Sequence, residues 1–320
     1  HYNPPKTGIL SYLPPTWVPY AELIRLNKPT GVLNIYLPYL FGALYGSWIS
    51  SPSPITLISR VLLLLIASFI LRSLGCAWND IIDRDLDRQV VRSCLRPMAR
   101  GAIPLPLALN FTLIQHLLWL AIISPILPLQ QNWTYILPLT GLVLAYPFGK
   151  RFTHHAQVIL GVTLACGIPI GASAVGANPL HFSPPPPPSS STTPHHPTNG
   201  IISLFIVYIL WSIIHDTIYA FQDVADDIRA GAKSMAVRYQ TIARPLLLLC
   251  GLLMVALQVY AGVVVGAQLG YHVISAGGSA LVVGVMLWRV RLQDPGDCEW
   301  WFRQGTLAWG LVVTGGMVVE

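Results

Sequence analysis

Long apolar segments, each bounded by glycine, proline or charge, run through almost the whole chain and constrain its fold more than any other feature. Most of them reach the roughly 20 residues that a helix needs to cross a lipid bilayer. We count nine, at residues 30–49, 55–78, 102–126, 133–148, 158–177, 201–222, 245–268, 272–289 and 304–319. The fourth and the ninth are short. The pattern predicts an all-α membrane protein with nine transmembrane helices.

Charged residues are scarce: they make up 10% of the 320 residues, against roughly 25% in an average soluble domain. With nine crossings, 17 of the 19 Lys and Arg residues fall on one side of the membrane. Positive residues concentrate on the cytoplasmic side of membrane proteins, so the charged loops are predicted to be cytosolic. The net charge of +6 therefore indicates membrane topology, and no nucleic-acid partner is expected.

Two regions lie outside the predicted helices. Residues 1–29 are expected to form a cytosolic or interfacial segment, followed by one transmembrane domain over residues 30–320. Inside that domain, residues 178–200 contain a run of prolines followed by serine and threonine, on the side opposite to the charged loops. Such a composition favours extended or flexible chain, so we expect a loop insertion there.

Seven of the 13 acidic residues gather in two short stretches, NDIIDRDLD at residues 79–87 and DVADD at residues 223–227. Both follow an even-numbered apolar segment, so both are predicted on the charged side. At about 100° per residue, a helix would present one face of the first stretch with Asn79, Asp80, Asp83 and Asp87, and would turn Asp85 away. The second stretch would likewise present Asp223, Asp226 and Asp227, with Asp216 two turns deeper.

Like charges on one helix face repel each other, and a bound cation relieves that repulsion. Oxygen ligands without Cys or His suit Mg²⁺, which in enzymes commonly holds a substrate phosphate as well. The alternative is two solvated loops with ordinary charges. Two clusters at ligand spacing on one side of the membrane favour a functional site, because acidic residues near membrane depth are costly.

Cationic residues close to these stretches fit an anion site. Arg72 lies seven residues before Asn79, on the same helical face and deeper in the membrane. An unpaired arginine there is costly, so a diphosphate or a carboxylate is expected to pair it. Lys150 follows Tyr146 by four residues, again on one face. Lys150 and Arg151 could equally serve only to set the topology.

The motifs resemble those of the UbiA superfamily of intramembrane prenyltransferases. The family pattern NDxxDxxxD is similar to residues 79–87, and its arginine–proline stretch to residues 92–101. The second pattern, YAxQDxxDDxxxGxKS, matches residues 219–234 throughout. The family's YxxxK element is similar to residues 146–150, and RLNKPTG at residues 25–31 resembles the family's entry to the first helix.

The resemblance implies a bundle of nine transmembrane helices around a central cavity, capped by the two Asp-rich loops. It implies two Mg²⁺ ions, and the expected metal ligands are Asn79, Asp83, Asp87, Asp223 and Asp227. The residues expected to be catalytic are Asp80, Asp83, Asp223 and Asp227. The residues expected to bind the diphosphate are Arg72, Tyr146, Lys150, Arg151 and Lys233.

The implied reaction transfers a prenyl group, farnesyl being favoured, from an isoprenyl diphosphate to a carbon of a phenolic acid. The chain looks most like the fungal meroterpenoid enzymes of secondary metabolism, which implies the endoplasmic reticulum membrane. The alternative in the same family is the 4-hydroxybenzoate polyprenyltransferase of ubiquinone synthesis, in the mitochondrial inner membrane.

Two other classes of protein remain open on the charges alone. A membrane transporter for an anion or a divalent cation would distribute its acids along the membrane helices, whereas here they gather at one face. An alcohol phosphotransferase would concentrate its acids in one motif, whereas this chain has two.

Overall fold

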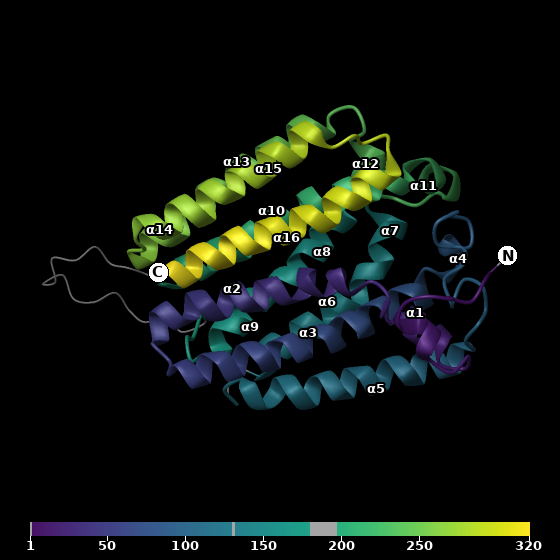
Figure 1. Cartoon of the computed structure of the whole chain (residues 1–320), viewed down its shortest axis with the longest axis horizontal. Helices are drawn as coiled ribbons and strands as arrows, with labels where there is room; N and C mark the ends of the chain where they lie inside the picture. Colours follow the sequence, from purple (N-terminus) through teal and green to yellow (C-terminus); the bar gives the residue numbers. More distant parts are fainter. Residues whose placement is uncertain (1, 130–131, 180–196) are drawn as a thin grey trace, which may run out of the picture.

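The computed structural model describes residues 2–129, 132–179 and 197–320. These residues form helices joined by turns, with no β-strand among them, which confirms the predicted all-α class. The long helices lie side by side along the long axis of the molecule (Figure 1). Most of the loop predicted at residues 178–200 lies outside the described residues, since positions 180–196 are not among them.

The helices of the described chain follow one another in three runs. The first contains η1 (Ile9–Tyr12), α1 (Val18–Leu23), η2 (Pro29–Val32), α2 (Leu33–Ser50), α3 (Pro54–Ile82), α4 (Arg84–Asp87), α5 (Leu105–Ile123) and η3 (Ser124–Ile126). The second contains α6 (Asn132–Ala145), η4 (Tyr146–Phe148), α7 (Gly149–Phe152), α8 (Ala156–Ala165) and α9 (Gly167–Ala174). The third contains α10 (Pro197–Ala220), η5 (Phe221–Asp223), α11 (Val224–Ala230), α12 (Met235–Arg238), α13 (Ala243–Val265), α14 (Leu269–Tyr271), the π-helical η6 (His272–Gly277), α15 (Gly278–Arg289) and α16 (Pro295–Val319).

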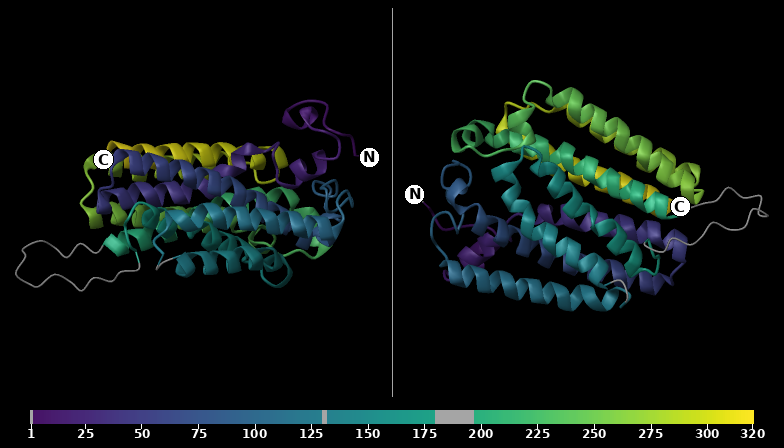
Figure 2. Two further views of the ribbon diagram at one scale, coloured as in Figure 1. Left: turned by 90° about the horizontal axis from the view of Figure 1, so that it is seen from below. Right: turned by 180° about the vertical axis from the view of Figure 1, so that it is seen from behind.

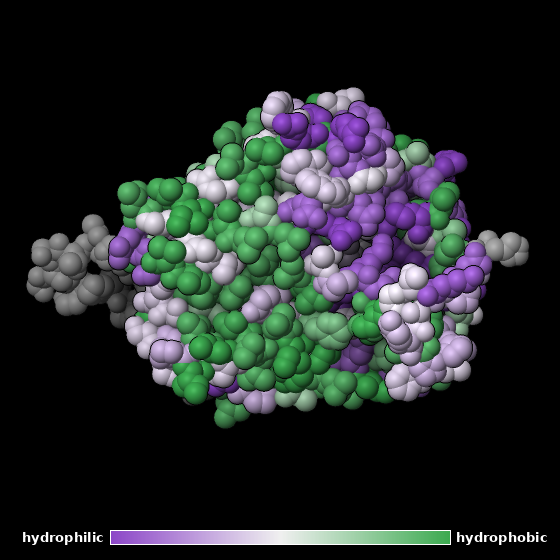
Figure 3. Space-filling model, in the orientation of Figure 1, coloured by the Kyte–Doolittle hydropathy of each residue, from purple (hydrophilic) through white to green (hydrophobic). Residues whose placement is uncertain are grey.

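Six helical stretches of the described chain are long and apolar enough to cross a membrane. They are Pro54–Ile82, Leu105–Ile126, Ala156–Ala174, Thr198–Ala230, Ala243–Val265 and Leu269–Arg289. Apolar side chains cover the middle of the molecule, and hydrophilic ones gather towards the end where α11 and α12 lie (Figure 3). The chain is therefore an integral membrane protein, as predicted.

The first, fourth and ninth predicted spans are helical but are not among these six. In α2, Asn, Tyr, Gly and Ser residues dilute the apolar character. Helix α6 has only 14 residues, and α16 carries Asp297, Glu299 and Arg303 in its first turns. Composition and length therefore separate these three helices from the others, although they run alongside them (Figure 2).

Helices α2 and α9 pack with their backbones in close contact. A methyl group added at Gly42 would lie 2.0 Å from the carbonyl oxygen of Ile168, and one at Gly171 would lie 2.1 Å from that of Tyr39. Small residues at such crossings are the usual means of helix association in membranes, where lipid supplies no hydrophobic drive between helices. The two glycines thus allow the backbones of α2 and α9 to approach each other closely.

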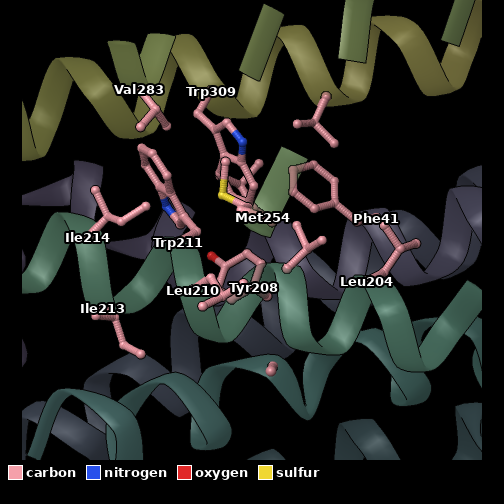
Figure 4. Close-up of a cluster of buried hydrophobic side chains, with 14 of the residues drawn as sticks. Phe41, Leu204, Tyr208, Leu210, Trp211, Ile213, Ile214, Met254, Val283 and Trp309 are labelled. Atoms are coloured by element: carbon pink, nitrogen blue, oxygen red, sulfur yellow. The ribbon is translucent and has the colours of Figure 1, made fainter. Parts of the chain in front are cut away.

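Stacked aromatic rings join α2, α10 and α16 in the largest buried cluster (Figure 4). The rings of Trp211 and Trp309 are stacked with centroids 4.4 Å apart, and Phe41 meets Trp309 edge to face at 5.4 Å. The Tyr208 hydroxyl donates to the Asn34 carbonyl at 2.6 Å, so its polar end is satisfied in the core. This cluster packs the three helices against one another in the core.

The short helices α1, α4, α7, α11 and α12 gather at one end of the bundle, together with the N-terminus (Figure 1). Both acidic stretches lie there, because α3 ends at Ile82 just before Asp83, and α10 passes through η5 into α11. Segments that are about 140 residues apart in sequence are therefore brought to one end of the molecule.

Candidate active site

A cavity of about 320 Å³ opens at the charged end of the bundle, between residues of α3, α8, α10 and the acidic stretches. Its inner wall is apolar and includes Ile35, Leu71, Leu139, Leu160 and Leu164. Its outer wall contains eight of the residues predicted for the site, namely Arg72, Asn79, Asp80, Tyr146, Lys150, Asp223, Asp227 and Lys233. Such a cavity suits a ligand with an anionic group at one end and an apolar group at the other.

Asp80 is held by two arginines from outside its own helix. Its Oδ1 accepts from Nη2 of Arg25 at 2.7 Å and lies 3.4 Å from Nη1 of Arg96. The side chain is only 1% exposed, and its Oδ2 has no hydrogen-bond partner among the described residues. A buried carboxylate is tolerated when a cation pairs with it. Because Arg25 is that cation, the ion pair also anchors the N-terminal segment that carries Arg25.

Asp83 pairs with Lys150 across the cavity wall. Its Oδ2 accepts from the Lys150 ammonium at 3.2 Å, and its Oδ1 has no partner in the described part of the chain. Burial acts to lower the pKa of Lys150, but the carboxylate of Asp83 and then Tyr146 outweigh it, so that the pKa stands above its ordinary value. Lys150 is therefore a fixed positive charge beside the acids.

Asp87 lies beyond the end of the helix that carries Asn79, so the two do not belong to one continuous helix as the predicted face assumed. Helix α3 ends at Ile82, and Asp87 belongs to the separate turn α4. Its carboxylate accepts from Nη1 of Arg96 at 2.9 and 3.0 Å. Arg96, which itself lines the cavity, thus bridges Asp80 and Asp87.

The second acidic stretch is tied, through Val91 and Arg92, to the segment that follows the first stretch. Arg92 donates from Nε to Asp223 at 2.9 Å and from Nη1 to the Tyr219 hydroxyl at 3.0 Å. The backbone N–H of Val91 donates to Asp226 at 3.0 Å. Asp223 and Asp227 line the cavity, whereas Asp226 accepts from the Val91 backbone. The prediction that all three carboxylates share one face is therefore wrong, because Asp226 and Asp227 are neighbours on α11 and successive helical residues point about 100° apart.

Arg72 lines the cavity but is paired with backbone oxygen rather than with a carboxylate. Its Nη2 donates to the Lys28 carbonyl at 2.8 Å, and its Nη1 to the carbonyls of Ile24 and Arg25 at 3.4 and 3.3 Å. A Cβ at Gly31 would lie 2.6 Å from Nη2 of Arg72. The sequence RLNKPTG therefore wraps around the guanidinium, and its glycine leaves the room that this requires.

Arg151 points away from the cavity. Its guanidinium donates to Asp85 at 2.6 and 3.0 Å and to the Ile82 carbonyl at 2.7 Å. The hydrogen bond from Arg151 lowers the pKa of Asp85 to about 2. Asp85 is 57% exposed, in agreement with its predicted outward direction. The structure thus separates Arg151 from Lys150, its neighbour in the predicted diphosphate set.

Lys233 lies in the cavity wall close to Lys150. Its backbone N–H donates to the Lys150 carbonyl at 2.9 Å, and its ammonium lies 3.5 Å from the Phe152 carbonyl. This contact links the GAKS end of the second motif to the turn after η4. Two lysines predicted for one anion are therefore held on one side of the cavity.

Among the described residues, no three acidic, histidine or cysteine side chains converge into a ready-made metal site. Four acids of the two stretches, Asp80, Asp83, Asp87 and Asp223, are instead paired with Arg25, Lys150, Arg96 and Arg92. The arrangement is a network of alternating charges around the cavity mouth.

A match over most of the sequence decides the family. The profile of the UbiA prenyltransferase family matches residues 39–311. This chain belongs to the UbiA prenyltransferase family. The predicted family and the predicted enzyme class are thereby confirmed, and the transporter alternative is not supported.

Relatives and solved structures agree with this membership. The chain is 40% identical to the prenyltransferase ascA of Acremonium egyptiacum over 280 residues, 87% of this chain and 78% of that protein. It is 31% identical to the mitochondrial 4-hydroxybenzoate polyprenyltransferase of Schizosaccharomyces pombe over 309 residues, 95% of this chain and 80% of that protein. Its fold matches a UbiA homologue from Archaeoglobus fulgidus bound to GPP and Mg²⁺, with a TM-score of 0.67 at 19% identity, over 94% and 99% of the two chains.

Several UbiA-type cavity residues of this chain escaped the sequence-based selection of site residues. Arg25, Arg92, Arg96 and Tyr219 all line the cavity. The three arginines lie in stretches that resemble the family. Positive residues set membrane topology as well as binding anions, so the sequence alone did not single these arginines out as site residues. Their position inside the motifs was the available signal, and only the fold shows which carboxylate each arginine meets.

Proposed function

We propose that the chain transfers a prenyl group, farnesyl being favoured, from an isoprenyl diphosphate to a ring carbon of a phenolic acid. The observation that carries the proposal is the cavity in which both acidic stretches and their cations meet above an apolar wall. The 40% identity to ascA, which is named a prenyltransferase, supports the proposal of prenyl transfer. We further propose a role in fungal meroterpenoid biosynthesis.

The oxygen donors at the cavity mouth fit Mg²⁺. Asn79, Asp223 and Asp227 line it, and Asp83 keeps an oxygen atom without a partner in the described chain. Mg²⁺ commonly binds one or two carboxylates and completes its shell with water and phosphate oxygens, so three converging acids are not required. We propose Asn79, Asp83 and Asp87 for one ion and Asp223 and Asp227 for another. Bound Mg²⁺ would supply positive charge to the leaving diphosphate.

In the proposed reaction, the charged residues of the chain bind the diphosphate and the apolar residues exclude water. Lys150 and Lys233 would hold diphosphate oxygens, and Arg92, which also lines the cavity and pairs with Asp223, would add a third positive group. Arg72 holds the segment of residues 24–28 in place through its carbonyl contacts. The apolar wall of the cavity keeps water away from the reactive carbon.

The reaction breaks one bond and forms another. The allylic C–O bond breaks, the electron pair leaves with the diphosphate, and a delocalised carbocation remains. The electron-rich ring carbon of the phenol forms the new C–C bond, and a base takes the displaced ring proton. Preorganised positive groups around the diphosphate favour the first step, because they face the charge that develops on it.

We propose nine membrane crossings, with α2, α6 and α16 added to the six apolar segments. This count places both acidic stretches in the cytosol, since nearly all positive residues then lie on that side. We propose the endoplasmic reticulum as the membrane.

A second function has a specific observation in its favour. The match to the 4-hydroxybenzoate polyprenyltransferase of Schizosaccharomyces pombe covers 95% of this chain. If the chain shared that activity, it would take longer donors and would belong to the mitochondrial inner membrane. The identity is lower than to ascA, 31% against 40%, so we place it second.

A microsomal assay separates the two functions. Farnesyl, geranylgeranyl and longer diphosphates are offered with 4-hydroxybenzoate or with alkylated dihydroxybenzoates, and products are identified by mass spectrometry. We expect farnesyl transfer to an alkylated dihydroxybenzoate. Preference for 4-hydroxybenzoate with a long donor would select the second function, and no transfer to any phenol would reject both.

A further inference from the structure

A second cavity, of about 250 Å³, lies between α3, α5 and α6, beside the first. Three residues, Leu71, Leu139 and Val143, line both cavities, so a single layer of side chains separates them. On its other side, the second cavity is bounded by Leu113 and Leu144, which are 55% and 45% exposed on the outer surface of the bundle. The second cavity therefore lies between the lipid-facing surface and the candidate active site.

Polar groups without partners lie in this otherwise apolar wall. The side chain of Trp119 is 0% exposed, and its Nε1 has no hydrogen-bond partner among the described residues. The hydroxyl of Thr140 is also buried and lacks a partner there. The His116 ring stacks on Trp119, with centroids 5.9 Å apart. Buried donors are normally satisfied, so two of them in one cavity point to a ligand that carries oxygen.

The chemistry of the wall distinguishes between the two substrates. A prenyl chain is a hydrocarbon and would leave the Trp119 and Thr140 donors unsatisfied, which costs free energy in a dry site. A phenolic ring has an apolar body, and its hydroxyl, carboxyl or carbonyl oxygens accept hydrogen bonds. Cavities for such ligands typically combine apolar and aromatic walls with a few placed polar groups.

We propose that the α3–α5–α6 cavity is a binding site for the phenolic acceptor on its way from the lipid to the active site. An acceptor oxygen takes hydrogen bonds from Trp119 Nε1 and Thr140 Oγ1, and the ring faces the shared layer of Leu71, Leu139 and Val143. The inference rests on the proposed function, because it presupposes an aromatic acceptor. It assigns the acceptor a route separate from the polar mouth that holds the diphosphate.

The test uses Thr140→Val and Trp119→Phe in the full chain, with the phenolic acid that wild-type microsomes accept. Each variant should raise the KM for the acceptor about fivefold, the loss expected for one neutral hydrogen bond, and leave the KM for the donor unchanged. Binding of the acceptor to the purified protein without donor should weaken by the same factor.

Thr112→Val is the matched control. Thr112 lines the same cavity, but its hydroxyl already donates to the Ala108 carbonyl at 2.8 Å. Its acceptor KM should stay at the wild-type value. Unchanged acceptor binding in Thr140→Val and Trp119→Phe would overturn the inference, and a rise in the donor KM instead would assign the cavity to the prenyl chain. A wild-type protein that prenylates no phenol would refute the proposed function itself, which is a separate outcome.

Discussion

Arg92 and Asp223, which are 131 residues apart in the sequence, form an ion pair in which Nε lies 2.9 Å from Oδ1 and 3.1 Å from Oδ2. The Arg92 side chain is 32% exposed and that of Asp223 14%, so the pair stands at the mouth of the cavity rather than in the core. It joins the second acidic stretch to the arginine–proline stretch at residues 92–101. In the proposed reaction, the same arginine neutralises the diphosphate.

Arg92→Ala should lower kcat/KM for the prenyl diphosphate by about 10- to 100-fold, because charge-assisted hydrogen bonds are each worth roughly 1.5–3 kcal/mol. Steady-state kinetics with varied donor measure the change. Arg229→Ala is the control, since Arg229 is 74% exposed and pairs only with Asp226 among the described residues. Equal activity of Arg92→Ala and the wild type would show that Arg92 does not take part.

Asp83→Ala and Asp227→Ala should each abolish Mg²⁺-dependent turnover, because each removes a carboxylate from a different proposed metal site. Binding of Mn²⁺, followed by electron paramagnetic resonance, should fall in both variants. The control is Asp85→Asn, whose carboxylate is 57% exposed and faces Arg151. Full activity in either alanine variant would exclude the two-metal account.

Lys150→Ala and Arg151→Ala should behave differently although the residues are adjacent. Lys150 lines the cavity and pairs with Asp83, so its loss should lower kcat/KM for the donor by at least about tenfold. Arg151 makes an exposed pair with Asp85, which is typically worth less than about 1 kcal/mol, and its loss should leave the kinetics near wild type. A similar loss of kcat/KM in both variants would show that Arg151 also binds the diphosphate.

Gly31→Ala should destabilise the protein, because the new methyl group would lie 2.6 Å from Nη2 of Arg72. The guanidinium would have to leave the carbonyls of residues 24–28, and we expect the thermal midpoint in detergent to fall by at least about 3 °C. Gly284→Ala is the matched control, since no atom lies within 4 Å of a Cβ added there. Equal melting of the two variants would contradict the described packing.

The membrane class and the motif residues were predictable because they depend on local sequence. Apolar length marks a spanning helix wherever it occurs. The helical spacing of Asn79 and Asp83 survives in the fold, because the backbone N–H of Asp83, which caps α3, donates to the Asn79 carbonyl. The direction of Asp85 also followed from helical period. These features need no knowledge of distant segments.

The partners of the charged groups were not predictable, because they come from remote segments. The sequence predicted Asp80 as a catalytic residue but not its partner Arg25, which lies 55 residues earlier. The end of α3 at Ile82 and the 3₁₀ turn η5 divide each acidic stretch between two helical segments. Helical spacing holds only while the helix continues, and the sequence does not mark these ends with proline or glycine.

The most direct measurement is prenyl transfer by the purified wild-type protein in liposomes, with farnesyl diphosphate and a phenolic acid, before and after removal of divalent cations. The account predicts a C-prenylated phenol with Mg²⁺, none with a chelator, and recovery when Mg²⁺ is restored. Transfer that continues at the same rate in the chelator, or no prenylated phenol under any condition, would contradict it.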